Sequence, residues 1–280
     1  MMRQYNDLNP EMPIGVFDSG IGGLTVAREI MKQMPDERIV YFGDTARVPY
    51  GNKSKETVTK FSEQIVRFLI RQNVKAIAVA CNTASAQAFP ALRESCPVPI
   101  LGVIEAGADS AAAATGNKKI GVIGTASTIA SEAYQKAIMS RIPDAEVIGR
   151  SCPLFVPLVE EGLWEDPVTD EIARRYLEEL CNRGIDTLIL GCTHYPLIRG
   201  TIARTMGEGV KLVDPAYETA RELKNLLAQR DMLADGRPAL GEGGQYEFYV
   251  SDMAEKFKAF ANMIIRYGIL SARTVDIEKY

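Results

Sequence analysis

Two cysteines in this chain stand at the ends of apolar runs that read alike. Cys81 closes the run AIAVAC and is followed by Asn-Thr, and Cys192 closes the run TLILGC and is followed by Thr-His. A thiol directly after a buried strand lies where open parallel sheets place their ligands. Two such thiols in two halves of one chain predict a substrate held from opposite sides. That arrangement suits a racemase, which removes a proton from one face and returns it to the other.

The elements that must position these thiols alternate between apolar strands and helical patterns. Such alternation predicts parallel strands joined by crossover helices, and therefore a doubly wound α/β fold. Repetition of the cysteine-bearing unit predicts two similar lobes with mostly parallel sheets and an active site in the cleft between them. Strands are expected at 13–17, 38–42, 76–80, 98–103, 119–123, 146–148, 187–190 and 211–213, and helices at 24–34, 55–72, 85–94, 105–114, 131–141, 167–181 and 196–206.

The C-terminal residues, from 216 onward, differ from this alternation. Residues 216–229 are expected to be helical, 230–244 to form a glycine-rich loop and 246–250 to form a strand. Asp252 is expected to cap a final helix. The domains predicted are 1–104 plus 217–280 for the first lobe and 105–216 for the second.

Composition describes a globular protein with a substantial core. The 280 residues are 46% hydrophobic, and 32 basic against 36 acidic residues give a net charge of −4. Because no basic stripe is present, nucleic acid is not an expected partner. The polar first ten residues lack the apolar core of a signal peptide, and no apolar run reaches the length of about 18 residues that would span a membrane. We therefore expect a cytoplasmic protein with no membrane partner.

The remaining cysteine chemistry is expected to be sparse. A cytoplasmic chain with five cysteines, no Cys-x-x-Cys pair and a single histidine argues against a disulfide framework and against a zinc site, so no metal is predicted. Cys181 is predicted to lie in the core on the apolar face of its helix, and Cys96 and Cys152 are predicted to be passive.

The loop after the first strand, Asp18 to Thr25, has the sequence DSGIGGLT. A dinucleotide site would use the glycines for the pyrophosphate, with Asp44 near the ribose. Thr25 occupies the position of the third small residue, and Asp18 places a negative charge where pyrophosphate would sit. We therefore expect Ser19 and the loop amides to hold a small anion at the helix N-terminus instead.

Four other loop positions have a functional and a structural interpretation. Arg47 is expected either to pair with a carboxylate or to be solvated. Thr125 and Thr128 are expected to bind a ligand carboxylate or to cap the next helix. Glu160, directly after an apolar run, has an ordinary helix-end charge as its alternative interpretation.

The combined motifs resemble those of the glutamate racemases, cofactor-independent amino-acid racemases that supply D-glutamate for bacterial peptidoglycan and hence for cell shape. The resemblance spans roughly residues 14–215. The matching segments are FDSGIGGL at 17–24, Asp44-Thr45 with VPYG at 48–51, ACNTA at 80–84, PLVE at 157–160 and GCTHYP at 191–196.

This resemblance implies a role for each matching residue. Cys81 and Cys192 would be the acid/base thiols, with Asp18 assisting Cys81 and with Glu160 and His194 assisting Cys192. No cofactor is implied. The implied substrate-binding residues are Asp18, Ser19, Tyr50, Gly51, Asn82, Thr83, Thr125, Thr128, Thr193 and His194. Glutamate is the implied partner; a homodimer is compatible with the sequence, which does not determine the oligomeric state.

The chemistry is consistent with these roles. One thiol must be ionised while the other is protonated, and a free thiol has a pKa of about 8.5. Neighbouring carboxylates raise a thiol's pKa, whereas a cationic imidazole lowers it. Asp18 and Glu160 are therefore expected to relay protons or to orient the thiols, and helix N-termini after both cysteines are expected to favour the thiolate.

Three other functions remain open from the sequence. An aspartate racemase would share the two-cysteine, two-lobe design, although His194 favours the glutamate branch. A non-catalytic amino-acid-binding protein would also use a cleft between α/β lobes. A thiol redox enzyme would join Cys81 to Cys192 in a disulfide during turnover.

Overall fold

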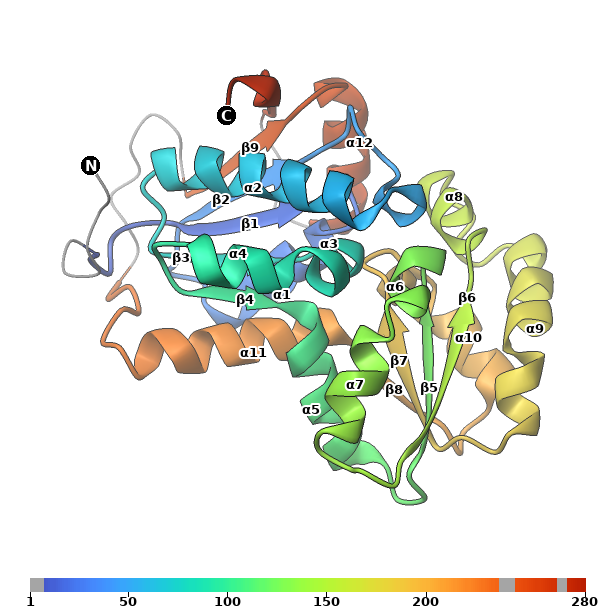
Figure 1. Ribbon diagram of the computed structural model, residues 1–280. Coiled ribbons are helices and arrows are strands. Elements are labelled where there is room, and N and C mark those ends of the chain that lie inside the picture. Colours follow the sequence, from blue (N-terminus) through green and yellow to red (C-terminus); the bar gives the residue numbers. More distant parts are fainter. Residues whose placement is uncertain (1–7, 237–244, 266–270) are drawn as a thin grey trace.

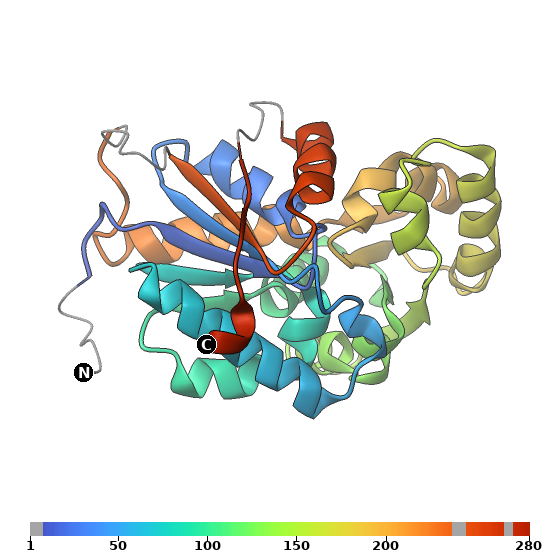
Figure 2. The same ribbon diagram turned by 90° about the horizontal axis from the view of Figure 1, so that it is seen from above.

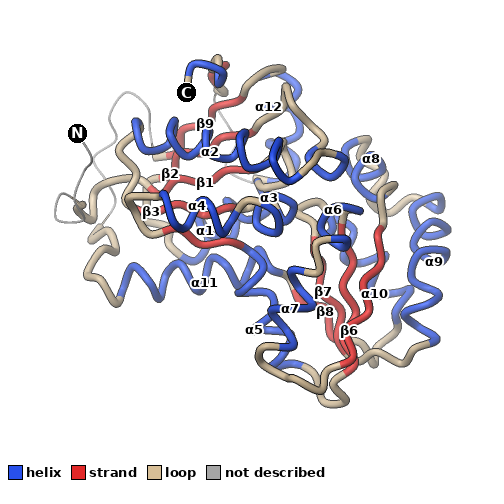
Figure 3. The backbone as a smooth tube through the Cα atoms, viewed as in Figure 1, coloured by secondary structure: helices blue, strands red, loops and turns tan. Residues whose placement is uncertain are grey.

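The computed structural model describes residues 8–236, 245–265 and 271–280, and these form two α/β lobes that lie side by side (Figure 1). Each lobe contains its own sheet with helices packed around it, and the strands fall into two separate groups (Figure 3). Every strand pair between the described residues is parallel. The predicted two-lobed, doubly wound α/β class is confirmed.

The sheet of the first lobe has six strands in the order β10-β9-β2-β1-β3-β4. Its central strands are buried along their full length, as the continuous apolar runs predict. The strands are β1 (Ile14–Asp18), β2 (Ile39–Gly43), β3 (Ala76–Val79), β4 (Ile100–Gly102), β9 (Tyr246–Val250) and β10 (Arg273–Thr274).

The sheet of the second lobe has four strands in the order β6-β5-β7-β8. They are β5 (Lys119–Gly124), β6 (Glu146–Ser151), β7 (Thr187–Gly191) and β8 (Lys211–Val213). This order repeats that of β2-β1-β3-β4 in the first lobe, strand for strand. Such a repeat is what duplication of one unit would give.

Amphipathic helices cover both sheets, and polar side chains begin several of them. Ser54, Asp166 and Asp214 accept hydrogen bonds from the first-turn amides of α2, α9 and α11. The α-helices are α1 (Leu24–Gln33), α2 (Lys55–Arg71), α3 (Asn82–Gln87), α4 (Phe89–Ser95), α5 (Val103–Ala114), α6 (Ala126–Ala130), α7 (Ala133–Met139), α8 (Phe155–Glu160), α9 (Pro167–Asn182), α10 (Arg199–Met206), α11 (Pro215–Ala228) and α12 (Ala254–Ile264). Short 3-10 turns are η2 (Tyr50–Asn52), η3 (Tyr195–Ile198) and η4 (Ile277–Lys279).

Three predicted helices differ from those in the structure. The helix expected at 85–94 is two helices that meet at Ala88, because Pro90 cannot donate a backbone hydrogen bond within a helix. The helix expected at 131–141 begins after Glu132, whose φ of 56° is left-handed and separates α6 from α7. The helix expected at 196–206 starts as η3 and becomes α-helical at Arg199.

Two predictions about single residues are wrong. Cys181 is exposed rather than in the core; it lies in the last turn of α9, where its sulfur approaches the Thr205 carbonyl and the Met206 sulfur at the end of α10. Asp252 does not cap α12; the capping position is Met253, which has a left-handed φ of 55°. The Asp252 carboxylate instead accepts a hydrogen bond from the Met253 amide at 2.7 Å.

The end of the chain returns to the first lobe. β9 pairs with β2 along Ile39–Gly43, and α11 lies against α1 and α5. Figure 2 shows the C-terminal segment crossing the first lobe to end beside α2, in agreement with the hydrogen bond from the Arg67 guanidinium to the Tyr280 carbonyl. Part of the loop predicted at 230–244 lies outside the described residues. The exact domain boundaries stay a prediction. Within the described ranges, no helix has the length and apolarity needed to cross a bilayer.

A buried ion pair joins the residues just before β2 and β3, at the amino ends of these strands of the first sheet. The Lys75 ammonium lies 2.6 Å from a Glu37 carboxylate oxygen and donates to the carbonyls of Pro10 and Met232. The second Glu37 oxygen accepts from the Ala234 amide at 2.9 Å. Both side chains are almost completely buried. The pair therefore ties the chain before β1 and the segment after α11 to the sheet.

We expect Lys75→Met to lower the free energy of unfolding by about 3–5 kcal/mol, because it leaves the Glu37 carboxylate buried without its counter-charge. Denaturant unfolding followed by circular dichroism measures the change. Lys60→Met on the exposed face of α2 is the matched control, with an expected change within about 0.5 kcal/mol. Equal stabilities of the two variants would contradict this account of the ion pair.

Candidate active site

A cavity of about 70 Å³ lies between the two lobes at the carboxyl ends of their strands. It is lined by Ser19, Gly20, Val48, Pro49, Tyr50, Gly51, Cys81, Asn82, Thr83, Thr125, Val156, Glu160, Cys192, Thr193 and His194. The structure thus brings both cysteines and most of the sequence-predicted site residues to one cavity. Asp18 and Thr128 do not line it, but both contact residues that do.

The cavity lies at the equivalent place in each sheet. In the order 2-1-3, the connections leaving the first and third strands diverge, and the crevice between them is where open α/β sheets bind ligands. Ser19 follows β1 and Cys81 lies just beyond β3, while Thr125 follows β5 and Cys192 follows β7. Each lobe therefore contributes its own switch point to the shared cavity.

The Cys81 thiol is held at the start of α3. Its sulfur accepts a hydrogen bond from the Ala84 amide at 3.4 Å and lies 3.4 Å from the Ser19 hydroxyl. Burial, followed by the negative charge of Asp18, raises the pKa of the Cys81 thiol to about 12. The expected effect of a neighbouring carboxylate on this thiol is confirmed. A thiol with so high a pKa keeps its proton at neutral pH.

Asp18 lies behind the cavity wall. One carboxylate oxygen accepts a hydrogen bond from the Gly20 amide at 2.9 Å, and the other has no hydrogen-bond partner among the described residues. Burial raises the pKa of Asp18 above its usual range, although the positive charge of His194 and the amides of the glycine turn oppose that effect. Such a carboxyl group can exchange a proton with its surroundings more readily than an exposed aspartate.

Cys192 has a different set of neighbours. Its sulfur lies 3.8 Å from Nδ1 of His194, and Nε2 of the same ring lies 3.0 Å from a Glu160 carboxylate oxygen. Burial lowers the pKa of His194, but the contacts with Cys192 and Glu160 outweigh burial and raise it to about 10. Burial likewise opposes ionisation of Glu160, yet the hydrogen bond and charge of His194 hold the Glu160 pKa below its usual range. The imidazole is thus a cation beside Cys192.

Three threonine hydroxyls meet across the interface between the lobes. The hydroxyl oxygen of Thr83 lies 3.0 Å from that of Thr125 and 3.3 Å from that of Thr128. Thr125 also caps α6 by accepting the Thr128 amide, so its functional and capping interpretations are compatible. This cluster offers hydrogen-bond donors that can turn toward a carboxylate in the cavity.

The remaining predicted residues differ in how their polar groups are used. The Asn82 side-chain oxygen accepts from the Tyr134 hydroxyl of the second lobe at 2.7 Å. The Tyr50 hydroxyl donates to Asp44, so this hydroxyl is engaged by the protein itself. Gly51 packs against Thr125, where an added Cβ would come within 3.0 Å. Asn82 and Gly51 therefore sit at contacts between the lobes.

The glycine turn after β1 lies against the loop that carries Cys192. A Cβ at Gly22 would come within 2.3 Å of the Thr193 hydroxyl and 2.5 Å of the His194 ring. The Thr25 hydroxyl donates to the Thr193 carbonyl at 2.9 Å from the other side. In the sequence, Thr25 counted against a dinucleotide motif. In the structure, its hydroxyl makes a contact between the two lobes.

Several residues of the site were missed by sequence reasoning. Val156 of α8 gives no signal because an apolar residue in a helix is expected to be core. Lys256 of α12 lines a recess next to the cavity together with Glu160, and its charge contributes to lowering the Glu160 pKa.

Two predictions can now be compared with the structure. Arg47 had been expected either to pair with a carboxylate or to be solvated, and it pairs with the Asp44 carboxylate at 2.7 Å. The helix N-terminus expected directly after Cys192 is a 3-10 turn.

No metal centre is evident in the described segments, which contain no group of three or more His, Cys, Asp or Glu side chains placed to hold an ion. All five cysteines are free thiols.

Comparison with known proteins gives a consistent result. The family model described as Asp/Glu/hydantoin racemase matches residues 15–223. A glutamate racemase from Geobacter metallireducens is 51% identical over 269 residues, covering 96% of this chain and 98% of that protein. Two solved structures are also similar over nearly the whole chain. A glutamate racemase from Bacillus anthracis is 40% identical with a TM-score of 0.91, covering 96% of this chain and 98% of that one. A glutamate racemase from Francisella tularensis in complex with D-glutamate is 40% identical with a TM-score of 0.88, covering 97% and 100%.

The single histidine of the chain allows a direct test of the site's electrostatics. We expect the imidazole resonance of His194 to titrate near pH 10 in an NMR pH series, far above the 6.5 of a free imidazole. Because the folded-state pKa is the higher one, the resulting stabilisation is complete below pH 6.5 and is lost as the pH rises through about 10. Glu160→Gln is expected to lower the midpoint, since it removes the carboxylate partner.

Glu161→Gln is the matched control, because Glu161 is the exposed neighbouring carboxylate at the end of α8. It is expected to leave the midpoint unchanged. A wild-type midpoint near that of a free imidazole would contradict the arrangement of Cys192, His194 and Glu160.

Proposed function

The chain belongs to the Asp/Glu/hydantoin racemase family and, within it, to the glutamate racemases, and we propose that it interconverts L- and D-glutamate by proton transfer between two cysteines. The observation that carries the mechanism is the presence of Cys81 and Cys192 in one cavity, supplied by opposite lobes and surrounded by unlike charges. A two-base racemase requires this combination, because one group must accept a proton while the other donates one.

In the proposed resting state, Cys192 is the thiolate and Cys81 the thiol. The cationic His194 beside Cys192 stabilises negative charge on sulfur, and the Glu160 carboxylate holds the imidazole in place. Cys81 keeps its proton because burial and Asp18 raise its pKa. The ionised thiol takes the α-proton from one face of glutamate, and the opposite thiol gives its proton to the other face. The two sulfurs then exchange protonation states, so the same pair serves the reverse direction.

Asp18 is proposed to exchange protons with Cys81, and its raised pKa supports that role. Glu160 and His194 are proposed to do the same on the Cys192 side. The substrate carboxylates are proposed to bind the hydroxyl groups and amides that surround the cavity, which also stabilise charge as the carbanion forms. These binding residues are Asp18, Ser19, Tyr50, Gly51, Asn82, Thr83, Thr125, Thr128, Thr193 and His194.

The alternative functions are less well supported. Relatives that match nearly the full length are named glutamate racemases, which favours glutamate over aspartate as substrate. A binding protein without catalysis would have no need for one thiol beside a cationic imidazole and another with a pKa of about 12. These functions are separated by measuring the incorporation of solvent deuterium at the α-position of glutamate and of aspartate.

The proposal extends to the cell. Supply of D-glutamate for bacterial peptidoglycan follows from the family resemblance. A cytoplasmic location is supported by the five free cysteines, which a reducing compartment would preserve. A homodimer stays a prediction from the sequence, and the proposed mechanism does not depend on it.

Replacement of either active-site thiol is expected to abolish racemisation. Cys81→Ser and Cys192→Ser should each lower kcat by roughly 10³-fold or more, since a serine hydroxyl is a poor acid/base at neutral pH. Residual exchange of the α-proton with D₂O should be confined to one isomer, and to opposite isomers in the two variants. Circular dichroism follows racemisation and NMR follows exchange.

Cys181→Ser is the control for this pair, because Cys181 is an exposed thiol that does not line the cavity. It is expected to retain full activity. The two-thiol mechanism is wrong if Cys81→Ser or Cys192→Ser racemises glutamate at a rate close to that of the wild type.

The spacing between the lobes gives a second kinetic test. Gly22→Ala is expected to lower kcat/KM by about 100-fold, because the new methyl group must displace Thr193 and the His194 ring by a substantial fraction of an ångström. Gly209→Ala is the matched control, since an added Cβ there has no neighbour within 4 Å among the described residues. Activity of Gly22→Ala equal to that of Gly209→Ala would show that the contact does not set the geometry.

A further inference from the structure

Residues 44–51 run from the end of β2 into η2 and form one wall of the cavity. We name them the wall loop. Its second half, from Val48 to Gly51, faces the cavity. Regular structure begins in it only at Tyr50, with the three-residue turn η2. Backbone hydrogen bonds alone therefore do not explain how this wall is held. The restraint comes from side chains and from the end of the chain.

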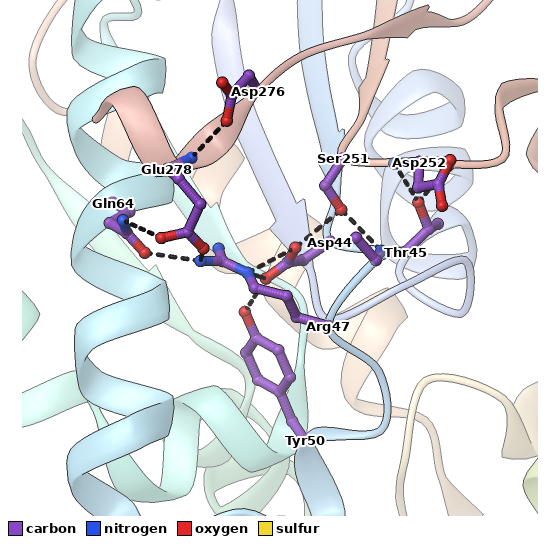
Figure 4. Close-up of polar contacts among 10 residues, drawn as sticks. Asp44, Thr45, Arg47, Tyr50, Gln64, Ser251, Asp252, Asp276 and Glu278 are labelled. Atoms are coloured by element: carbon purple, nitrogen blue, oxygen red, sulfur yellow. Dashed lines mark hydrogen bonds and ion pairs between the residues drawn. The ribbon is translucent and has the colours of Figure 1, made fainter.

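Asp44 is the centre of that restraint. Its carboxylate is fully buried and lies at the end of β2. It accepts hydrogen bonds from the Arg47 guanidinium at 2.7 Å, from the Tyr50 hydroxyl and from the Ser251 hydroxyl at 2.9 Å (Figure 4). Two of these donors belong to the wall loop itself, and the third follows β9. The carboxylate thus gathers the loop around one point.

Arg47 connects this point to the C-terminus. Its Nη1 atom donates to Gln64 of α2 at 2.6 Å and to the Glu278 carboxylate at 2.8 Å (Figure 4). The guanidinium also stacks over the Phe61 ring, 4.0 Å from its centroid. A planar guanidinium can serve these partners at once, whereas a lysine ammonium presents a single point of charge.

Glu278 is itself placed by a docked turn. It belongs to η4, its own amide donates a hydrogen bond to the Asp276 side chain, and its neighbour Ile277 is buried in the first lobe. The Tyr280 ring packs edge-on against Phe68 of α2 at 5.2 Å. The C-terminal turn is therefore held in place by its packing against the first lobe.

A second contact fixes the first half of the wall loop. The Ala46 amide donates to the Ser251 hydroxyl at 2.8 Å, and the Asp252 amide donates to the Thr45 hydroxyl at 3.0 Å. Ser251, Asp252 and Glu278 all lie beyond residue 223, where the match to the family model ends. The wall is thus held by a part of the chain outside that match.

We propose that Arg47 and Glu278 are positioning residues, which hold Tyr50 and Gly51 against the cavity so that affinity for the substrate depends on the C-terminal turn. The inference rests on the proposed function, because the affinity concerned is that for glutamate. Neither residue lines the cavity. Their effect passes through Asp44 and the wall loop to the side of the cavity facing Thr125.

The test compares Glu278→Ala and Arg47→Lys with the wild-type enzyme. Each is expected to raise KM for glutamate roughly three- to tenfold with kcat within about twofold, the pattern of lost binding without lost acid/base chemistry. Glu278→Gln should restore most of the affinity, since its amide oxygen can still accept from Arg47. Lys279→Ala is the matched control, from the same turn but with an exposed side chain paired to Asp276, and it should behave as the wild type.

A double-mutant cycle with Tyr50→Phe shows whether the effect passes through the wall loop, because two changes on one path are less than additive. The proposal is overturned if Glu278→Ala leaves KM unchanged, if it lowers kcat alone, or if its effect adds fully to that of Tyr50→Phe. Hydrogen exchange of the amides of residues 44–51 provides a readout that does not depend on glutamate. Faster exchange in Glu278→Ala than in Lys279→Ala supports the proposed positioning role of Glu278, and equal exchange overturns it. An inactive wild-type enzyme would refute the proposed function alone.

Discussion

The geometry of the site depends on how closely the two lobes approach at the glycine turn after β1. Gly22 has no side chain, and the Thr193 hydroxyl and the His194 ring occupy the space that one would fill. The Thr25 hydroxyl bonds to the Thr193 carbonyl at the same place. On the opposite side of the cavity, Thr83 meets Thr125 at 3.0 Å. Because both sides are fixed by contacts between the lobes, the cavity is small and each thiol faces it from a set position. A larger residue at the turn would push the two half-sites apart. Protein interiors are closely packed, so an added methyl group is accommodated only when its neighbours move.

The two half-sites share their position in the fold but not their electrostatics. The strand order β2-β1-β3-β4 recurs as β6-β5-β7-β8, so Cys81 and Cys192 follow equivalent strands. One thiol is buried beside a carboxylate, and the other lies beside an imidazole that a second carboxylate keeps protonated. A perfectly symmetric pair that shared one proton would hold it on either sulfur with equal preference. The difference between the neighbours of the two thiols therefore sets which sulfur keeps the proton before the substrate binds.

Local signals in the sequence were sufficient for the fold class and for the convergence of the two cysteines. Apolar runs of strand length, each followed by a helical pattern, predicted parallel sheets, and residues directly after such runs must gather at the carboxyl edge. What could not be predicted depends on conformation at single residues or on distant partners. The left-handed backbone at Glu132 separates two short helices, α6 and α7, of which the sequence pattern indicated only the second. Cys181 shares the apolar spacing of α9 yet is exposed in the last turn of that helix. The second carboxylate partner of Arg47 could not be identified, because Glu278 is 231 residues away in the chain and carries no motif.

The support of the wall loop follows from the cost of burying Asp44. A carboxylate removed from water is tolerated only when hydrogen bonds and an opposite charge replace its hydration. Arg47, Tyr50 and Ser251 supply that replacement, and each is fixed by a different part of the chain. Loss of one donor would leave the charge partly unsatisfied, so the loop, the end of β9 and the C-terminal turn are expected to form their structure together. Residues that line the cavity and residues that end the chain are thus linked through one buried charge. A comparison restricted to the motifs around the thiols would describe the chemistry of this site without the part of the molecule that holds its wall.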